Sequence, residues 1–332
     1  MVRVLSDSDV ADCLDLEDLL PVVHEAFVKQ GRGEVERPER PHFPVGAGLS
    51  ASDAGDGDGS EPKGTGLVMP AYLHGARFYA TKLVGVHEDN ADRGLPTVNA
   101  QLALTEADTG LPAGYFAGTR ITNARTGCIG GLAARELAEE PVTLGLLGAG
   151  TQARWQARAI DAATVLESVR VYSPSDSKEA CADDLRSELG VDAEAVESPE
   201  SAVSGANVVV TTTTATEPVF PGDALEPGTL VVAVGAYTAE MRELDTETFE
   251  RASQIFADVP EEAAEIGDTL AAEIGADDLV PLSEVFEDRA GRDSEGEIIV
   301  VESVGTAVLD AATGEYVFEE AEEQGVGEQV EL

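Results

Sequence analysis

The spacing of hydrophobic residues changes along this chain and predicts two kinds of sheet. Around Lys82, in ARFYATKLVGV, apolar and polar residues alternate strictly, which predicts a strand with one buried face. Residues 95–118 show two further strands joined by a turn, and residues 16–33 have the pattern of a helix. We therefore expect residues 1–118 to form an antiparallel α+β domain, in which 45–66 is a flexible Gly-, Ser- and Asp-rich insertion.

Residues 119–301 show a different pattern, in which short apolar runs alternate with helical segments. The runs VTLGLL, VRVY, NVVV and LVVAV have the length and β-branched content of buried parallel strands. Helical patterns at 151–163 and 176–189 lie between the first three runs. This alternation predicts an α/β fold with a Rossmann-type doubly wound parallel sheet beside the α+β domain. The tail reads as a strand and then a helix, and we expect 302–332 to return to the first domain.

Charge adds information about the environment and the partners. The sequence carries 64 acidic and 21 basic residues, a net charge of −43, and only four of its residues are lysines. Such a charge strongly disfavours nucleic acid and anionic membranes as partners. A dispersed acidic coat with few lysines is typical of cytosolic proteins from halophiles, in which molar salt screens the self-repulsion.

The rest of the composition argues against several classes of protein and of site. The chain has no apolar run of about 18 residues and no apolar segment of the signal-peptide kind near residue 1, so we expect a cytoplasmic protein. Its three cysteines lie far apart and form no CxxC, and its four histidines show no ligand spacing. We therefore expect neither a disulfide framework nor a metal site.

A glycine-rich turn carries the first candidate chemistry. Gly148, Gly150 and Ala153 form a GxGxxA motif that follows an apolar strand and opens a helix, the context that a dinucleotide-binding fingerprint requires. Gly148 permits the tight turn, and Gly150 lets a pyrophosphate approach the helix N-terminus, where free N–H groups favour anions. A ligand-free turn is the alternative, and the context favours NAD or NADP.

The end of the second predicted strand bears on the choice of cofactor. A Rossmann fingerprint usually places a carboxylate there, which binds the adenosine ribose. Here the position is Ser173, which would not repel the 2′-phosphate of NADP. No arginine follows to bind that phosphate, although Lys178 lies near in the sequence. The sequence leaves NAD and NADP both open.

Lys82 is the candidate acid–base residue. The alternation places it on the same face as Phe78, Ala80 and Val84, which is the apolar face of the strand. Burial lowers the pKa of a lysine toward neutral pH, which suits proton transfer. The alternatives are a lysine at the sheet edge whose ammonium reaches solvent and a register shifted by one residue.

Arg125 and Thr126 precede a helical segment rich in glycine and alanine, which predicts close packing of that helix. An arginine at the start of this helix would add charge to its N-terminus and suit a carboxylate or phosphate. A surface ion pair with one of the many acids is the alternative.

Taken together, these segments resemble the ornithine cyclodeaminase/mu-crystallin family, which includes an archaeal type of alanine dehydrogenase. The resemblance runs through nearly the whole chain, in the family's order. It rests on the segments RPERPHFP, LVMPAY, ATKLVGV, LPTVNAQLALTEADTG, ITNARTG, LLGAGTQARWQA, AVGAYTAEMRELD and ESVGTAVLDA. With the acidic composition, it suggests a haloarchaeal member of the alanine dehydrogenase type.

The resemblance implies a homodimer, with a substrate-binding domain built from both chain ends and an NAD(P) domain between them. It places Arg40 and Arg125 on the substrate carboxylate and Lys82 in the active site. The cofactor contacts that it implies, together with those of the fingerprint, are Thr97, Arg125, Thr126, Gly148, Gly150, Thr151, Gln152, Ser173, Thr211, Val234 and Ser303.

Two positions depart from the members that cyclise ornithine. Those members carry an aspartate soon after the AVG strand, where this chain has Tyr237, and a glutamate where this chain has Leu67. A buried second amino group would have no carboxylate partner here, which is unfavourable. We predict that Tyr237 lines or caps the substrate pocket without being the acid–base group.

These observations favour an NAD(P)-dependent oxidoreductase of a small α-amino acid, most like alanine dehydrogenase, with Lys82 in proton transfer. A ketimine or pyrroline-2-carboxylate reductase would use the same site. Ornithine cyclodeaminase and a non-catalytic NADP-gated binding protein are the alternatives from other classes. The expected partner is a small amino-acid or imine substrate.

Overall fold

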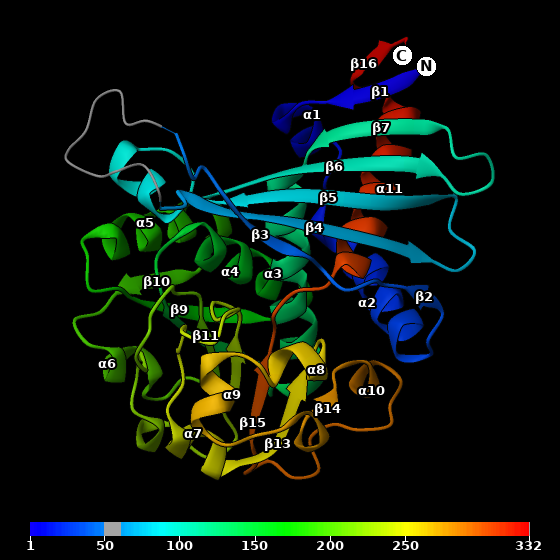
Figure 1. Ribbon diagram of the computed structural model, residues 1–332. Coiled ribbons are helices and arrows are strands. Elements are labelled where there is room, and N and C mark those ends of the chain that lie inside the picture. The colour runs from blue at the N-terminus through cyan, green and yellow to red at the C-terminus, as the bar shows by residue number, and fades with distance from the viewer. Residues whose placement is uncertain (50–60, 332) are drawn as a thin grey trace. The chain divides into compact units, whose positions relative to one another are not determined.

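The chain forms two compact units in the computed structural model, which describes residues 1–49 and 61–331 (Figure 1). The first unit contains Met1–Leu14, Gly33–Thr122 and Ala307–Leu332. The second contains Asp15–Arg32 and Asn123–Thr306. Half of the predicted insertion at 45–66 lies outside the described residues, and its two ends belong to strands β3 and β4.

The first unit is a mixed sheet with helices. Its elements are β1 (Val2–Leu5), α1 (Asp7–Asp12), β2 (Val35–Glu36), β3 (His42–Val45), β4 (Gly64–Leu73), β5 (Phe78–Val86), a 3₁₀ helix (Glu88–Arg93), β6 (Val98–Glu106), β7 (Pro112–Ala117), α11 (Ala307–Gln324) and β16 (Glu328–Val330).

The order of this sheet is β16-β1-β7-β6-β5-β4-β2, and β3 pairs with β4 (Figure 1). The strands from β4 to β7 pair antiparallel, as the alternation predicted, whereas β1 pairs parallel to β7. One sheet face packs on α11, which contacts β4, β5 and β6. Gly314 lets α11 approach this face closely, because a Cβ there would collide with Leu102. Phe318 stacks edge-on against Phe78 of β5, with ring centroids 5.0 Å apart.

The second unit alternates strands with helices and short turns. Its elements are α2 (Leu16–Gly31), α3 (Gly118–Leu137, which begins in the first unit), β8 (Val142–Leu147), α4 (Thr151–Ala163), β9 (Leu166–Tyr172), α5 (Ser177–Leu189), β10 (Asp192–Ala195), α6 (Pro199–Val203), β11 (Val208–Thr211), a 3₁₀ helix (Gly222–Ala224), β12 (Leu230–Ala233), α7 (Thr246–Arg251), β13 (Ala252–Ala257), α8 (Pro260–Ala263), α9 (Gly267–Ala271), a 3₁₀ helix (Ala276–Asp278), β14 (Val280–Pro281), α10 (Ser283–Phe286) and β15 (Ile298–Glu302).

The sheet of the second unit is parallel throughout, in the order β10-β9-β8-β11-β12-β15-β13-β14. Every residue of β11, β12 and β15 is buried, which explains their unbroken apolar sequences. The strand order reverses its direction at β8 and β11, and ligands of doubly wound sheets bind at the carboxyl ends of the strands at such a point. The α/β fold class predicted from the sequence is confirmed.

Helix α3 corrects one prediction about Arg125. The helix begins at Gly118, so Arg125 lies in its interior rather than at its N-terminus, and the argument from free N–H groups does not apply. The small residues lie within the helix, where they let a neighbouring helix pack closely against it. A Cβ at Gly127 would lie 2.6 Å from the Trp155 carbonyl oxygen of α4, and one at Gly131 would lie 2.5 Å from that of Ala159. The predicted tight packing is thus an α3–α4 contact.

The described residues lack two features, a membrane-spanning helix and a metal-binding cluster. No helix in this part of the chain has the length and apolar character to cross a membrane. The same residues contain no group of three or more histidines, cysteines, aspartates or glutamates that could hold a metal ion. All three cysteines are buried as free thiols.

Candidate active site

Lys82 is buried in the middle of the first unit's sheet. It lies on β5 opposite Met69 of β4 and Leu102 of β6, on the face that packs against α11. Only 1% of its surface is exposed, which confirms the burial that the alternation predicted. Its Nζ lies 2.5 Å from Oδ2 of Asp310 on α11, and that carboxylate is equally buried.

Asp310 changes the protonation state that is expected for Lys82. Burial alone favours a neutral amine, but an opposite charge in direct contact favours the ammonium. A short, charge-assisted hydrogen bond in a dry site also fixes the direction of the Lys82 side chain. The pair can therefore present an oriented ammonium, which is a proton donor, from an apolar sheet face.

Sequence reasoning missed Asp310 because 228 positions separate it from Lys82. One signal was available: ESVGTAVLDA places an acid among small apolar residues of a predicted helix, where a buried carboxylate needs a cation. Leu67, also buried, lies on the same β4 face as Met69. This face therefore carries a leucine where an ornithine-cyclising site would need a second carboxylate.

Two further predicted residues belong to the first unit. Arg40 lies half-buried in the segment between β2 and β3. Thr97 precedes β6 and is exposed, and its carbonyl oxygen accepts a hydrogen bond from the backbone N–H of His87 at 2.8 Å. The roles assigned to both stay predictions.

The glycine-rich turn of the second unit has the geometry of a dinucleotide fingerprint. Gly148 has φ +112°, and a Cβ there would lie 2.5 Å from Thr212 Oγ1. Gly150 is the N-cap of α4, where no side chain caps the helix, and a Cβ on Gly150 would meet open space. The first N–H groups of α4 are therefore accessible to an anion such as a pyrophosphate. The turn fits the cofactor that the motif predicted.

Residues on both sides of this turn join α3 to α4. Gln152 donates a hydrogen bond from Nε2 to Asn123 Oδ1 at 2.8 Å. Gln156 donates from its buried Nε2 to the carbonyl oxygen of Thr126 at 2.9 Å. Thr151, the first residue of α4, is exposed beside the open helix end. Gln152, Thr126 and Thr151 thus belong to one rigid assembly around the turn.

Ser173 directly follows β9, as predicted, and its hydroxyl lies 3.2 Å from that of Ser175. The ammonium of Lys178 binds protein groups of a neighbouring segment. Its Nζ donates to the Val196 carbonyl oxygen at 3.0 Å and lies 3.4 Å from a Glu197 carboxylate oxygen. The cation that the sequence suggested for a 2′-phosphate is therefore already engaged.

Arg125 and Ser303 meet around a buried carboxylate. Asp258 accepts hydrogen bonds from the Ser303 hydroxyl at 2.7 Å and from the backbone N–H groups of Val304 and Gly305. Gly305 has φ +76°, and a Cβ there would lie 2.9 Å from Arg125 Nη1. Burial raises the pKa of Asp258, while these hydrogen bonds and the charge of Arg125 lower it. Arg125 is 5% exposed, so the alternative of a surface ion pair is wrong.

The loops after β11 and β12 meet at Glu243, which sequence reasoning did not single out. Thr211 ends β11 and donates its hydroxyl proton to Glu243 Oε2 at 2.8 Å. Val234, just beyond β12, donates its N–H to the Thr211 carbonyl oxygen at 3.1 Å. Burial raises the pKa of Glu243 to about 7, and hydrogen bonds from Thr213, Thr211 and Gly235 oppose this rise.

Two more buried carboxyls lie close to Glu243. Burial raises the pKa of Asp268 to about 6, against the lowering effect of two backbone hydrogen bonds and of Arg242. Burial also raises the pKa of Glu302 well above its usual range, and the charges of Asp268, Glu243 and Asp258 add to the rise. Glu302 Oε1 has no hydrogen-bond partner. A neutral Glu302 carboxyl avoids placing one more charge in this buried group.

Tyr237, half-buried, packs against an apolar cluster of the second unit that includes Ala236, Met241 and Val304. Its predicted place in the substrate pocket stays a prediction.

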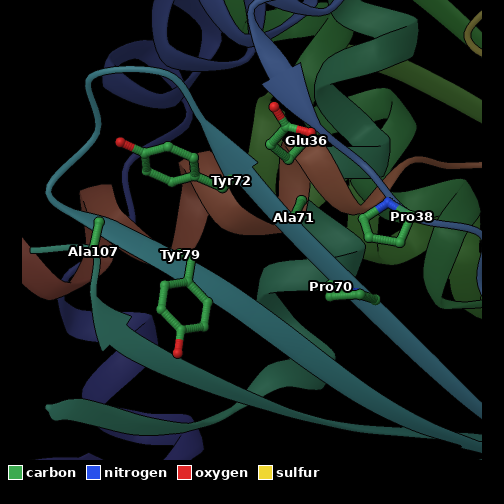
Figure 2. Close-up of a pocket in the computed structure, with 7 residues that line it drawn as sticks. All are labelled: Glu36, Pro38, Pro70, Ala71, Tyr72, Tyr79 and Ala107. Atoms are coloured by element: carbon green, nitrogen blue, oxygen red, sulfur yellow. The ribbon is translucent and has the colours of Figure 1, made fainter. Parts of the chain in front are cut away.

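A cavity of about 330 Å³ opens in the first unit (Figure 2), and Lys82 is not among the described residues that line it. Tyr72 of β4 and Tyr79 of β5 line it, together with Glu36 and Pro38. Because strand residues alternate between faces, Tyr79 lies on the sheet face opposite Lys82. The cavity is therefore not the place of the proposed proton transfer.

Comparison with known proteins shows the same architecture in enzymes. The chain is 32% identical over 277 residues to a Δ1-pyrroline-2-carboxylate reductase of Bacillus cereus, which covers 81% of this chain and 85% of the relative. The structure of the Thermococcus litoralis Δ1-pyrroline-2-carboxylate reductase with NADH and L-proline superposes with a TM-score of 0.91 at 30% identity. That match covers 99% of this chain and 100% of the other.

An archaeal alanine dehydrogenase dimer with bound NAD superposes with a TM-score of 0.86 at 29% identity, and covers 100% of this chain and 99% of the other. The model of the ornithine cyclodeaminase/mu-crystallin family matches residues 2–325. The resemblance seen in the sequence motifs is thereby confirmed, and the chain belongs to the ornithine cyclodeaminase/mu-crystallin family of enzymes.

Proposed function

We propose that this enzyme is an NAD(H)-dependent reductase of a small α-imino acid. The observation that carries the proposal is the buried Lys82–Asp310 pair on an apolar sheet face, in a chain whose other unit has an open dinucleotide turn. A buried ion pair is expensive to maintain and adds little to stability, so its presence favours a chemical role.

In this proposal the ammonium of Lys82 donates a proton to the imine nitrogen, and Asp310 holds that ammonium charged and oriented. The guanidinium groups of Arg40 and Arg125 bind the substrate carboxylate, as the family resemblance implies. When bound at the Gly148 turn, NADH would supply the hydride to the imine carbon. The protein contributes the alignment of these groups and an apolar surrounding that strengthens their electrostatic effects.

Two substrates fit this chemistry. Δ1-Pyrroline-2-carboxylate, a cyclic imine that yields proline, is the first candidate because reductases of this imine are similar over most of the chain. The imine of pyruvate and ammonia is the second, because similarity to an archaeal alanine dehydrogenase extends over the whole chain. Leu67 and Tyr237 argue against ornithine, because neither supplies the carboxylate that the ornithine-cyclising members carry at its position.

We further propose that NADH is preferred to NADPH. Ser173 would bind a ribose hydroxyl, and the cation that follows it in the sequence, Lys178, is engaged by Val196 and Glu197. A 2′-phosphate would therefore gain little charge compensation from this segment.

We also propose that the active form is a homodimer. The sheet face of the first unit opposite α11 exposes Tyr79, Leu83 and Tyr115, each at least 39% accessible. Large apolar side chains gathered on one sheet face are typical of an interface between proteins. A second copy of this chain would cover them.

The substrate is tested by NADH absorbance. Purified protein, kept in roughly molar KCl to screen its charge, is supplied with Δ1-pyrroline-2-carboxylate, or pyruvate with ammonia, and with NADH or NADPH. We expect the fastest oxidation with the cyclic imine and NADH. Proline formed from L-ornithine without net NADH use would instead establish a cyclodeaminase. Tight NADPH-dependent binding of a ligand without turnover would establish a binding protein.

A further inference from the structure

The carboxylate of Glu243 joins the loops that follow two neighbouring strands of the parallel sheet. Its Oε1 accepts the backbone N–H of Thr213 at 2.5 Å, and its Oε2 accepts the backbone N–H of Gly235 at 2.8 Å. The Thr211 hydroxyl supplies a third hydrogen bond at 2.8 Å. Thr213 lies two residues beyond β11, and Gly235 lies two residues beyond β12. Glu243 therefore fixes the spacing of these two loops.

A single residue, Thr212, connects these two loops to the glycine-rich turn. Thr212, next to Thr213, donates its backbone N–H to the Leu147 carbonyl oxygen at 2.9 Å. Its Oγ1 occupies the place that a Cβ on Gly148 would need. A shift of Thr213 would thus be transmitted to the first glycine of the fingerprint. Gly235 is equally confined, since a Cβ there would collide with the Thr213 carbonyl oxygen.

Hydrogen bonds to the backbone of Glu243 and of the next residue fix the position of Glu243 itself. A single Oδ1 of Asp268 accepts the backbone N–H of Glu243 at 2.8 Å and that of Leu244 at 2.6 Å. The Glu243 carbonyl oxygen accepts the Val219 N–H at 2.8 Å. The carboxylate is fully buried, so it acts through these bonds and does not reach solvent.

We propose that Glu243 is a positioning residue for the dinucleotide, which holds the loops after β11 and β12 at the spacing that lets the Gly148 turn accept the cofactor. This inference rests on the proposed use of NADH. A purely structural role, in which Glu243 only satisfies buried N–H groups, is the competing explanation. The two explanations differ in whether affinity for NADH changes more than stability does.

Glu243→Gln, measured at a pH above the Glu243 pKa of about 7, is the informative variant because it keeps the shape of the ionised carboxylate but offers one acceptor atom instead of two. In either orientation of the amide, Thr213 or Gly235 faces an NH₂ group and loses its acceptor. We expect the Kd for NADH, measured by the change in NADH fluorescence in roughly molar KCl, to rise about 10- to 100-fold, as displacements near 1 Å in a binding site typically cause. The same factor should appear in KM for NADH more than in kcat.

Asp245→Asn is the matched control. Asp245 lies two positions away and also accepts two backbone N–H groups, those of Gly222 and Thr248, at 2.8 Å each. We expect it to lower the melting temperature about as much as Glu243→Gln while leaving the Kd for NADH within about twofold. Equal losses of affinity in both variants, or unchanged affinity in Glu243→Gln, would overturn the proposal.

Thr211→Val serves if Glu243→Gln does not fold, because it removes only the hydroxyl donor and keeps the side-chain shape. It should weaken NADH binding by a smaller factor, and wild-type affinity in Thr211→Val would then overturn the proposal. A wild-type protein that binds neither NADH nor NADPH would contradict the proposed function instead, so the two failures can be told apart.

Discussion

Removing the charge of Asp310 should destabilise the protein more than removing almost any other single charge. The Asp310→Leu variant leaves the ammonium of Lys82 buried beside an apolar side chain, with 2% of that lysine side chain exposed. Breaking one side of a buried ion pair costs about 3–5 kcal/mol of unfolding free energy, because the remaining charge is still desolvated. The Lys82→Met variant should cost a similar amount for the same reason.

The double variant Lys82→Met/Asp310→Leu separates the effect of the ion pair on stability from its effect on catalysis. Two apolar residues of similar volume often match or exceed a buried ion pair, so its unfolding free energy should return to within about 1 kcal/mol of the wild type. Its catalytic activity should stay absent, because the proton donor is gone. Stability would thus be recovered without activity, which a lysine of purely structural function would not predict.

The assay is urea unfolding in roughly molar KCl, followed by far-ultraviolet circular dichroism. Fluorescence is unsuitable because the single tryptophan of the sequence, Trp155, lies in the second unit. With a urea m-value of about 2 kcal/mol/M, each single variant should unfold roughly 1.5–2.5 M earlier than the wild type.

Glu188→Gln is the control for this experiment. It breaks an exposed pair of similar length, Arg158–Glu188 at 2.6 Å, and should cost no more than about 1 kcal/mol. A double variant as unstable as the sum of the two single variants would refute the reasoning, because Lys82 and Asp310 would then not be coupled.

Three further outcomes are expected. Because burial raises the pKa of Glu243 from 4.5 to about 7, its proton is retained on folding, and unfolding free energy should fall by up to about 3 kcal/mol as pH rises from roughly 4.5 to 7; Glu243→Gln, which cannot titrate, should reduce the fall measured by urea unfolding. Gly148→Ala, strained at φ +112° and crowded by Thr212, should weaken NADH binding about tenfold or more in a fluorescence titration. Leu83→Arg should convert the proposed dimer to a monomer in light scattering, and an unchanged mass would contradict the proposed interface.

The sequence patterns predicted correctly those features of the structure that depend on residues close together in the chain. The alternation around Lys82 gave the correct strand face, since one buried face imposes a period of two. The GxGxxA context gave the turn and the helix N-terminus at Gly150. In both cases the residues that determine the conformation are neighbours in the sequence.

Long-range partners were not predictable in the same way. Asp310 and Glu243 act on residues that are distant in the chain, and nothing in their own segments identifies those residues. Arg125 was misplaced at a helix start because nothing in its own segment shows that α3 already begins at Gly118. The close packing expected from the small residues is present, and its partner, α4, is a separate element of the chain.

We propose that Lys82 supplies a proton in an NADH-dependent reduction. The direct measurement is the initial rate of NADH oxidation with Δ1-pyrroline-2-carboxylate by the wild type and by Lys82→Met/Asp310→Leu, in roughly molar KCl. We expect rapid oxidation by the wild type and at least about a hundredfold slower oxidation by the double variant, with the Kd for NADH unchanged. Equal rates in the two proteins would contradict the proposed role of Lys82.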